Sequence, residues 1–217
     1  MFERKPLRAD VAAEIQGRII DGRLPAGIRI NESLLASELG ISRTPLREAM
    51  LCLDTEGVLT SDMGRGFRVP LLEADELQDI LGALNVALSA AVRHGADDDI
   101  KSRLEARNLL NRARMQSAEP ALFCEQLYLL MRHLVAGCYN RILRRECLRL
   151  TRLTLRYLFV GMSRGAAPLT MLNHIETALA DLDHHDRAAA AGNLGQALAE
   201  LSRELAPRFP TEDSGQA

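Results

Sequence analysis

One stretch of the sequence, residues 31–50, constrains the fold most strongly, because it reads as two short helices joined by a tight turn. Gly40 follows an apolar run, at a position where a helix commonly ends in a left-handed residue that glycine adopts without strain. Pro45 suits the first turn of a following helix, and Ser42 or Thr44 can cap its free amides. The pattern is typical of a helix-turn-helix.

The second helix of this stretch has an apolar side and a polar side. Its apolar positions recur at helical spacing and predict a buried face: Leu46, Ala49, Met50 and Leu53. Arg43, Thr44 and Arg47 fall on the outer side near its N-terminus, the end that enters the major groove in helix-turn-helix docking. An arginine there can donate two hydrogen bonds to guanine. These residues are therefore candidates for DNA contact.

A small hairpin is predicted after this helix. Residues 58–60 and 67–69 are β-prone, and turn-forming residues lie between them. Gly64 and Gly66 flank Arg65 and would let the backbone lie close to a phosphate or let the arginine reach the minor groove. A hairpin beside a recognition helix predicts a winged helix-turn-helix.

From Glu73 onward the composition favours helices throughout, because Leu, Ala, Arg and Glu dominate and β-branched residues are few. Breaks at Gly, Pro and polar residues predict six helices, near 74–94, 97–116, 120–137, 140–162, 168–182 and 186–205. The expected fold class is mostly α, a winged helix-turn-helix followed by an all-helical bundle. The expected domains are residues 1–70, residues 71–210 and a flexible tail, 211–217.

The N-terminal part resembles the GntR family of bacterial transcription regulators. The resemblance is carried by residues 19–27, Glu32, Leu35, Ala36, residues 39–49, Leu53, Glu56, Gly57 and residues 64–66. It implies that Arg43, Thr44, Arg47 and the wing at 64–66 contact the operator, and that Ser42 touches phosphate. Glu32, Leu35 and Leu39 are expected to serve packing and capping. The alternative for the charged residues is an ordinary solvated helix face.

A second resemblance concerns the helical part. It is carried by residues 84–85 with 90–91, residues 140–143, His174 with Ala180, and Asp186 with residues 189–191. Through them the helical part resembles the FCD type of regulatory domain found in FadR-like GntR proteins, closest to its six-helix, VanR-like variant. Many members of that domain family bind a divalent metal through Asp and His ligands. In this chain two of the ligand positions fall on Leu127 and Met131, a third on His174 and the fourth near Gln196. One imidazole alone binds metal poorly, so no metal or other cofactor is expected, and any pocket should be less polar.

Several residues of the helical part are candidates to line an effector cavity. They comprise Tyr128, Met131, Tyr157 and His174, with Asn85, Arg152 and Gln196 as polar anchors. The alternative is that these residues belong to the plain core, since Met131 and Tyr157 stand at helical spacing with leucines.

Composition narrows the class of protein further. The net charge of −2 requires a local cationic patch for nucleic-acid binding, and 4% aromatic residues with no Trp favour duplex over single-stranded DNA. The four cysteines form no CxxC pair, and neither a signal peptide nor a membrane-length apolar run is present, so a reducing cytoplasm is expected. The sequence has no GxSxG, HExxH, P-loop or GxGxxG motif, so an enzyme is not expected.

The expected function is sequence-specific transcription regulation by a homodimer. One recognition helix reads few base pairs, so useful specificity requires two half-sites and a palindromic operator. The leading hypothesis is a repressor whose affinity for duplex DNA is changed by a small-molecule effector in the helical domain. The alternative is a regulator whose pocket binds nothing. No membrane partner is expected.

Overall fold

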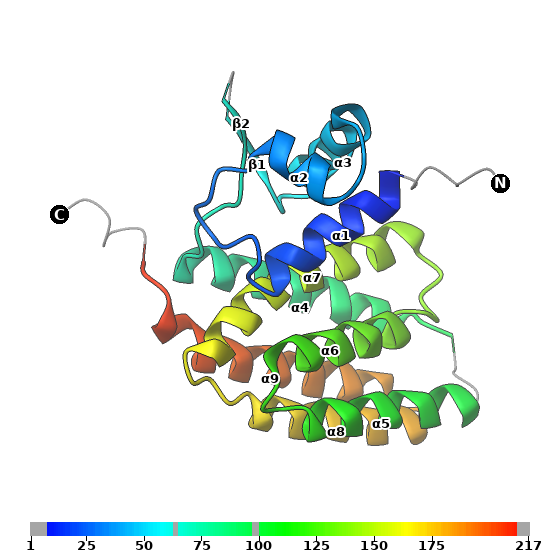
Figure 1. The fold of residues 1–217 in the computed structure, drawn as a ribbon. Coiled ribbons are helices and arrows are strands. Elements are labelled where there is room, and N and C mark those ends of the chain that lie inside the picture. The colour runs from blue at the N-terminus through cyan, green and yellow to red at the C-terminus, as the bar shows by residue number, and fades with distance from the viewer. Residues whose placement is uncertain (1–7, 63–64, 97–99, 212–217) are drawn as a thin grey trace. The chain divides into compact units, whose positions relative to one another are not determined.

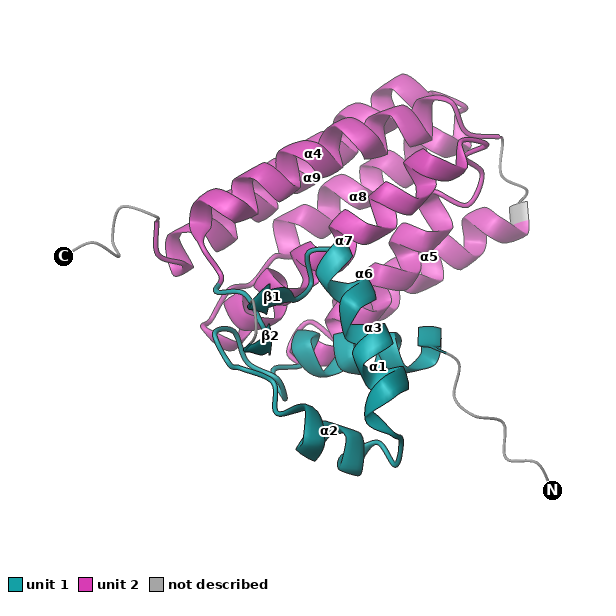
Figure 2. Ribbon diagram, turned by 90° about the horizontal axis from the view of Figure 1, so that it is seen from above, with its two compact units in different colours: residues 1–71 teal, residues 72–217 magenta. Residues whose placement is uncertain are grey.

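The computed structural model describes residues 8–62, 65–96 and 100–211 of the chain. The chain divides into two compact units, residues 1–71 and residues 72–217 (Figure 2). Of the predicted tail, 211–217, all but Thr211 lies outside the described residues. The fold class expected from the sequence is confirmed, with a winged helix-turn-helix unit followed by a helical unit (Figure 1).

The described residues of unit 1 form three helices and a two-stranded antiparallel sheet. Its elements are α1 (Arg8–Ile20), α2 (Glu32–Glu38), α3 (Arg43–Thr55), β1 (Thr60–Asp62) and β2 (Gly66–Arg68). Helices α1 and α2 both pack against α3. The core between them is formed by side chains at most 5% exposed: Val11, Ile15, Ile19, Leu35, Leu46, Ala49, Met50 and Leu53. The four apolar positions predicted for α3 are all among them.

Strand β2 has a hydrogen-bonded neighbour along each of its two edges. Thr60 pairs with Arg68, and Asp62 pairs with Gly66 across the hairpin. On the other side of β2, the segment before α2 adds backbone hydrogen bonds, including Ile30 N to Phe67 O at 2.9 Å. The wing is therefore attached to the start of the helix-turn-helix as well as to its end.

The position of the hairpin differs slightly from the prediction. The strands were expected at 58–60 and 67–69, whereas β1 begins only at Thr60 and β2 at Gly66. Val58 and Leu59 are each 1% exposed, so their β-prone side chains belong to the core below the hairpin. The β-propensity of this apolar pair predicts a strand at a place where the structure has core packing instead.

Unit 2 is built from helices and a short 3-10 turn. They are α4 (Ala74–Arg93), α5 (Ile100–Met115), α6 (Pro120–Leu134), α7 (Arg141–Ser163), α8 (Leu169–Asp183), α9 (Arg187–Leu205) and η1 (Ala206–Arg208). The six predicted helices are confirmed with small shifts at their ends. Helix α4 packs on α7 and α9, α9 on α8, and α6 on α5 and α7 (Figure 1).

The two ends of unit 2 meet at the start of α4. The Tyr157 hydroxyl of α7 donates to the Glu76 carboxylate, and the Tyr157 ring packs edge-on against Phe209, with 5.0 Å between ring centroids. Burial, followed by the bond to Glu76, raises the pKa of Tyr157 far above its ordinary value. The Ala74 amide donates to the Pro210 carbonyl at 2.8 Å. These contacts anchor the first turn of α4.

No helix among the described residues is both long and apolar enough to cross a lipid bilayer.

Candidate nucleic-acid interface and helical-domain cavity

The N-terminus of α3 presents a group of exposed polar side chains. Ser42 is the N-cap residue, with extended backbone (φ −76°, ψ 162°), but its side chain makes no capping hydrogen bond. Arg43, Thr44 and Arg47 are exposed on the same end of the helix. Leu46, on the opposite side of α3, is fully buried, so the packing of the helix directs these polar side chains outward.

Both arginines of α3 are positioned by the first turn of α2. Arg43 Nη2 donates to Ser33 Oγ at 2.5 Å. Arg47 Nη1 lies 3.5 Å from Glu32 Oε2, while the Arg47 side chain keeps 62% of its surface exposed. The first turn of α2 is itself fixed, since Asn31 Oδ1 accepts hydrogen bonds from two backbone amides at 3.1 Å. The guanidinium groups therefore lie in defined places and remain accessible.

The wing approaches the same group of side chains. Gly66 has φ +87°, a conformation that side chains other than glycine rarely adopt. A Cβ atom at Gly66 would lie 3.4 Å from Glu32 Oε1, so the Glu32 carboxylate sits between the recognition helix and the wing. Arg65 is exposed at the turn of the hairpin, and Gly64 lies outside the described residues.

Two further arginines accompany the wing. Arg29 Nη2 lies 3.0 Å and Arg68 Nη2 3.7 Å from Asp62 Oδ2, and all three side chains are at least 41% exposed. The sequence reasoning did not single out Arg29 and Arg68, because they belong to no recognisable motif and come together only through strand pairing. The ion pair between the Glu32 carboxylate and Arg47 was likewise not predicted, since Glu32 was expected to serve packing and capping.

This geometry defines unit 1 as a winged helix-turn-helix with its exposed arginines on the recognition helix and the wing. Residues 7–69 match the family described as bacterial regulatory proteins, gntR family. This part of the chain is therefore a GntR-family helix-turn-helix domain. The description of that family names its members as regulatory proteins, in line with the expectation for residues 7–69.

Named relatives agree with this assignment. The Nta operon transcriptional regulator of Aminobacter aminovorans is 48% identical over 67 residues, which cover 31% of this chain and 32% of that protein. Matches of this kind thus span about a third of the relatives' length. The HTH-type transcriptional repressor GlaR of Escherichia coli strain K12 is 29% identical over 168 residues, covering 73% of this chain and 75% of the repressor.

A solved structure extends the likeness to the helical unit. Escherichia coli McbR/YncC superposes with a TM-score of 0.76 at 21% identity, covering 94% of this chain and 99% of that one. At this identity the likeness concerns the fold alone. It shows that the fold of unit 1 followed by that of unit 2 occurs in another solved structure.

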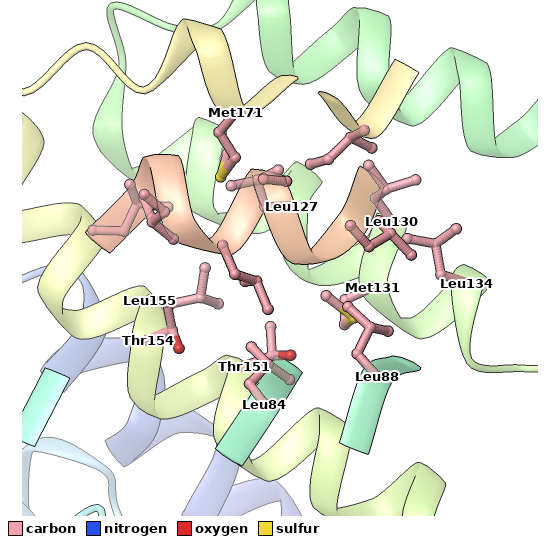
Figure 3. Close-up of a pocket in the computed structure, with 16 residues that line it drawn as sticks. Leu84, Leu88, Leu127, Leu130, Met131, Leu134, Thr151, Thr154, Leu155 and Met171 are labelled. Atoms are coloured by element: carbon pink, nitrogen blue, oxygen red, sulfur yellow. The ribbon is translucent and has the colours of Figure 1, made fainter. Parts of the chain in front are cut away.

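Unit 2 contains a cavity of about 60 Å³ among five helices (Figure 3). Its lining is Leu84, Leu88, Leu127, Leu130, Met131, Leu134, Thr151, Thr154, Leu155, Leu158, Met171, Ile175, Leu194, Ala197, Leu198 and Leu201. Of the seven residues predicted to line an effector cavity, Met131 alone is in this set. The positions that the FCD resemblance gives to metal ligands, Leu127 and Met131, both face the cavity with apolar side chains.

The other aromatic and cationic candidates lie elsewhere in unit 2. Tyr157 is fully buried at the start of α4, against Phe209, and is not part of the cavity lining. Tyr128 and Arg152 are bound to each other, with Arg152 Nη1 donating to the Tyr128 hydroxyl at 3.0 Å. Their side chains tie α6 to α7 outside the cavity.

The remaining candidates lie nearer the surface. His174 Nε2 lies 3.8 Å from Glu200 Oε1, with 30% of the His174 side chain exposed. Asn85 and Gln196 are exposed, and Asn85 Oδ1 lies 2.9 Å from the place of a Cβ at Gly195, so α4 and α9 pack closely there. Within the described parts of the chain, no three His, Cys, Asp or Glu residues form a group that could hold a metal ion.

Proposed function

We propose that the chain is a sequence-specific, DNA-binding transcription regulator that acts in the cytoplasm as a homodimer, most simply as a repressor. The observation that carries the proposal is the group of exposed arginines on the N-terminus of α3 and on the wing, within a GntR-family domain. In this proposal Arg43, Thr44 and Arg47 read base edges in the major groove of duplex DNA, and Ser42 binds phosphate.

The wing supplies the second contact. Arg65 and the backbone at Gly64 and Gly66 approach the phosphates or the minor groove in the proposed complex. Two copies related by two-fold symmetry place two recognition helices about one DNA turn apart, so the operator should be palindromic. GlaR, which is named a transcriptional repressor, supports the same direction of regulation.

The test is a titration of the purified protein against DNA from upstream of its own gene, at two salt concentrations. Each of Arg43→Ala and Arg47→Ala should weaken binding about tenfold to a hundredfold, because each bidentate arginine contributes roughly 1–3 kcal/mol. Arg23→Ala is the matched control. It removes the same charge from unit 1, from a side chain already paired with Asp21, and should leave affinity almost unchanged.

The result against the proposal is equally specific. If neither the upstream fragment nor any sequence selected from genomic DNA shows saturable binding, unit 1 does not act as a DNA reader. If the three variants bind equally well, α3 is not the reading element.

We further propose that a small molecule in unit 2 changes the affinity for the operator, acting through unequal binding to two states of the dimer. The cavity among α4, α6, α7, α8 and α9 supports this proposal. The second candidate is a regulator without an effector, which is favoured by the lack of any charged side chain in the cavity lining. A ligand that lowers operator affinity of the wild-type protein would decide for the first.

A further inference from the structure

The cavity of unit 2 is lined by side chains from five helices. Helix α6 contributes four of them, α7 four, α9 four, and α4 and α8 two each (Figure 3). Most of these side chains are buried, but Leu127, Met131 and Leu134 of α6 are only half-buried. Helix α6 is therefore the wall of the cavity nearest to solvent.

The lining offers almost no polar group to a ligand. Fourteen of its sixteen side chains are Leu, Ile, Met or Ala, and the two exceptions are Thr151 and Thr154. Their hydroxyls donate to carbonyls of their own helix, Thr151 to Cys147 O at 2.7 Å and Thr154 to Leu150 O at 3.0 Å. Each hydroxyl proton is already used, so the hydroxyls can only accept from a ligand.

This lining discriminates against charge. A carboxylate in the cavity would lose its hydration and meet neither a cation nor a free donor, which is strongly unfavourable. Cavities lined by Leu and Ile stay dry, so an apolar molecule would enter without displacing hydrogen-bonded water. The thioether side chains of Met131 and Met171 have three rotatable bonds, so they can adjust to a ligand larger than the resting volume.

We propose that this cavity is a binding site for a small, uncharged, apolar molecule, such as a short aliphatic or alicyclic hydrocarbon, and that it excludes carboxylates. The identity of this molecule as an effector rests on the proposed function above. The binding itself does not, because it requires only unit 2 within the intact chain.

The experiment uses the full chain labelled with ¹³C at the methionine methyl groups and contains no DNA, so its failure is distinct from a failure of operator binding. The probes are xenon, cyclopentane and cyclopentanecarboxylate at neutral pH. Cyclopentane should shift the Met131 and Met171 methyl resonances in a saturable manner. The resonances of Met50 in unit 1 and of Met115, which is 85% exposed, should stay in place.

The comparison of probes decides the chemical class. Cyclopentanecarboxylate at equal concentration should produce less than about a tenth of the cyclopentane shift, because of its desolvation cost. Shifts by xenon without any by cyclopentane would show a void too small for a ligand and would overturn the proposal. Equal binding of the carboxylate, or no response of Met131 and Met171 to any probe, would overturn it as well.

A filled-cavity variant adds an independent arm. Ala197→Met on α9 places a longer side chain into the cavity, since Ala197 lines it and is 2% exposed. It should abolish the cyclopentane shift of Met131, whereas Ala188→Met, on an exposed position of the same helix, should retain it. Retention of the shift in a folded Ala197→Met protein would contradict the proposed location. If that variant does not fold, the native-chain spectra alone decide.

Discussion

In the proposed function, the arginine-bearing side of unit 1 and the cavity of unit 2 recognise their ligands in opposite ways. On α3, directional charged groups stand in the open, and Ser33 and Glu32 of a neighbouring helix hold Arg43 and Arg47 in place. In the cavity, all but two lining side chains are apolar, and the hydroxyls of the two threonines are already bonded to their own helix. In that proposal the first surface selects by hydrogen-bond pattern, and the second can select only by size and lack of charge.

The largest expected effect is a loss of stability when the buried side of α3, opposite its exposed arginines, is truncated. Leu46→Ala removes a fully buried side chain of α3 and should lower the free energy of unfolding of unit 1 by about 2–5 kcal/mol. Leu51→Ala, on the 50% exposed side of the same helix, should change it by less than about 0.5 kcal/mol. Urea denaturation measures both. Equal losses would mean that α3 does not separate a core side from a solvent side as described.

A second prediction tests how far the interior of unit 2 excludes water from a buried thiol. Burial raises the pKa of Cys124 from 9.0 to about 12, so the native state keeps this thiol protonated where the unfolded chain loses the proton. The stabilisation is complete below pH 9 and is lost as pH rises toward 12, at about 1.4 kcal/mol per pH unit at most. Urea denaturation between pH 8.5 and 11 should show the decline.

Two variants assign that decline to the buried thiol. Cys124→Ala should reduce the pH dependence without abolishing it, because burial also raises the pKa of Cys147 to about 12. Cys52→Ala, at a half-buried position of unit 1, should leave it as in the wild type. A pH dependence that is the same in all three proteins would rule out Cys124 as its source.

A third prediction separates stability from DNA contact at the two N-caps of the helix-turn-helix. Asn31→Ala removes the acceptor for two amides of α2 and should cost about 1 kcal/mol of stability. Ser42→Ala removes a hydroxyl that makes no capping bond, so thermal unfolding should hardly change while operator affinity falls. Destabilisation by Ser42→Ala comparable to that by Asn31→Ala would show that its hydroxyl serves the fold instead.

The smallest effect should come from the carboxylate beside the recognition helix. Glu32→Gln keeps the side-chain shape but removes the negative charge 3.5 Å from Arg47. Such an exposed pair contributes at most about 1 kcal/mol to stability, so folding should be nearly unaffected. Operator affinity should rise severalfold at low salt, and the slope of log K against log salt should steepen by up to about one. An unchanged slope would mean that Glu32 does not act as a counter-ion for Arg47.

The parts of this molecule that local signals control were predictable. Gly40 and Pro45 mark the turn and the start of α3, and the Gly and Pro breaks of unit 2 set six helices within a few residues. The predicted start of the wing came too early in the sequence, because the pair Val58 and Leu59 is β-prone but packs into the core. These are boundary errors within a correct set of elements.

The cavity was not predictable, for a physical reason. Tyr157 and Leu158 are adjacent and both fully buried, yet Leu158 faces the cavity and Tyr157 faces Phe209, which lies 52 residues further along the chain. Helical spacing in the sequence shows which side of a helix is apolar. Which other helix packs against that side depends on the arrangement of all six helices. The ion pair of Glu32 was not predicted for the same reason, since Arg47 reaches it only through the packing of α2 against α3.

The hydrogen bond from Ala74 to Pro210 has a consequence for the order of folding. It joins residues 136 positions apart in the sequence, so nearly the whole of unit 2 must be synthesised before this bond can form. During synthesis, the first turn of α4 waits for Phe209 and Pro210 to leave the ribosome, although unit 1 has by then had all of its residues available. Unit 1 can therefore fold long before unit 2 is complete, and a nascent chain carries a finished DNA-binding domain ahead of an unfinished helical one.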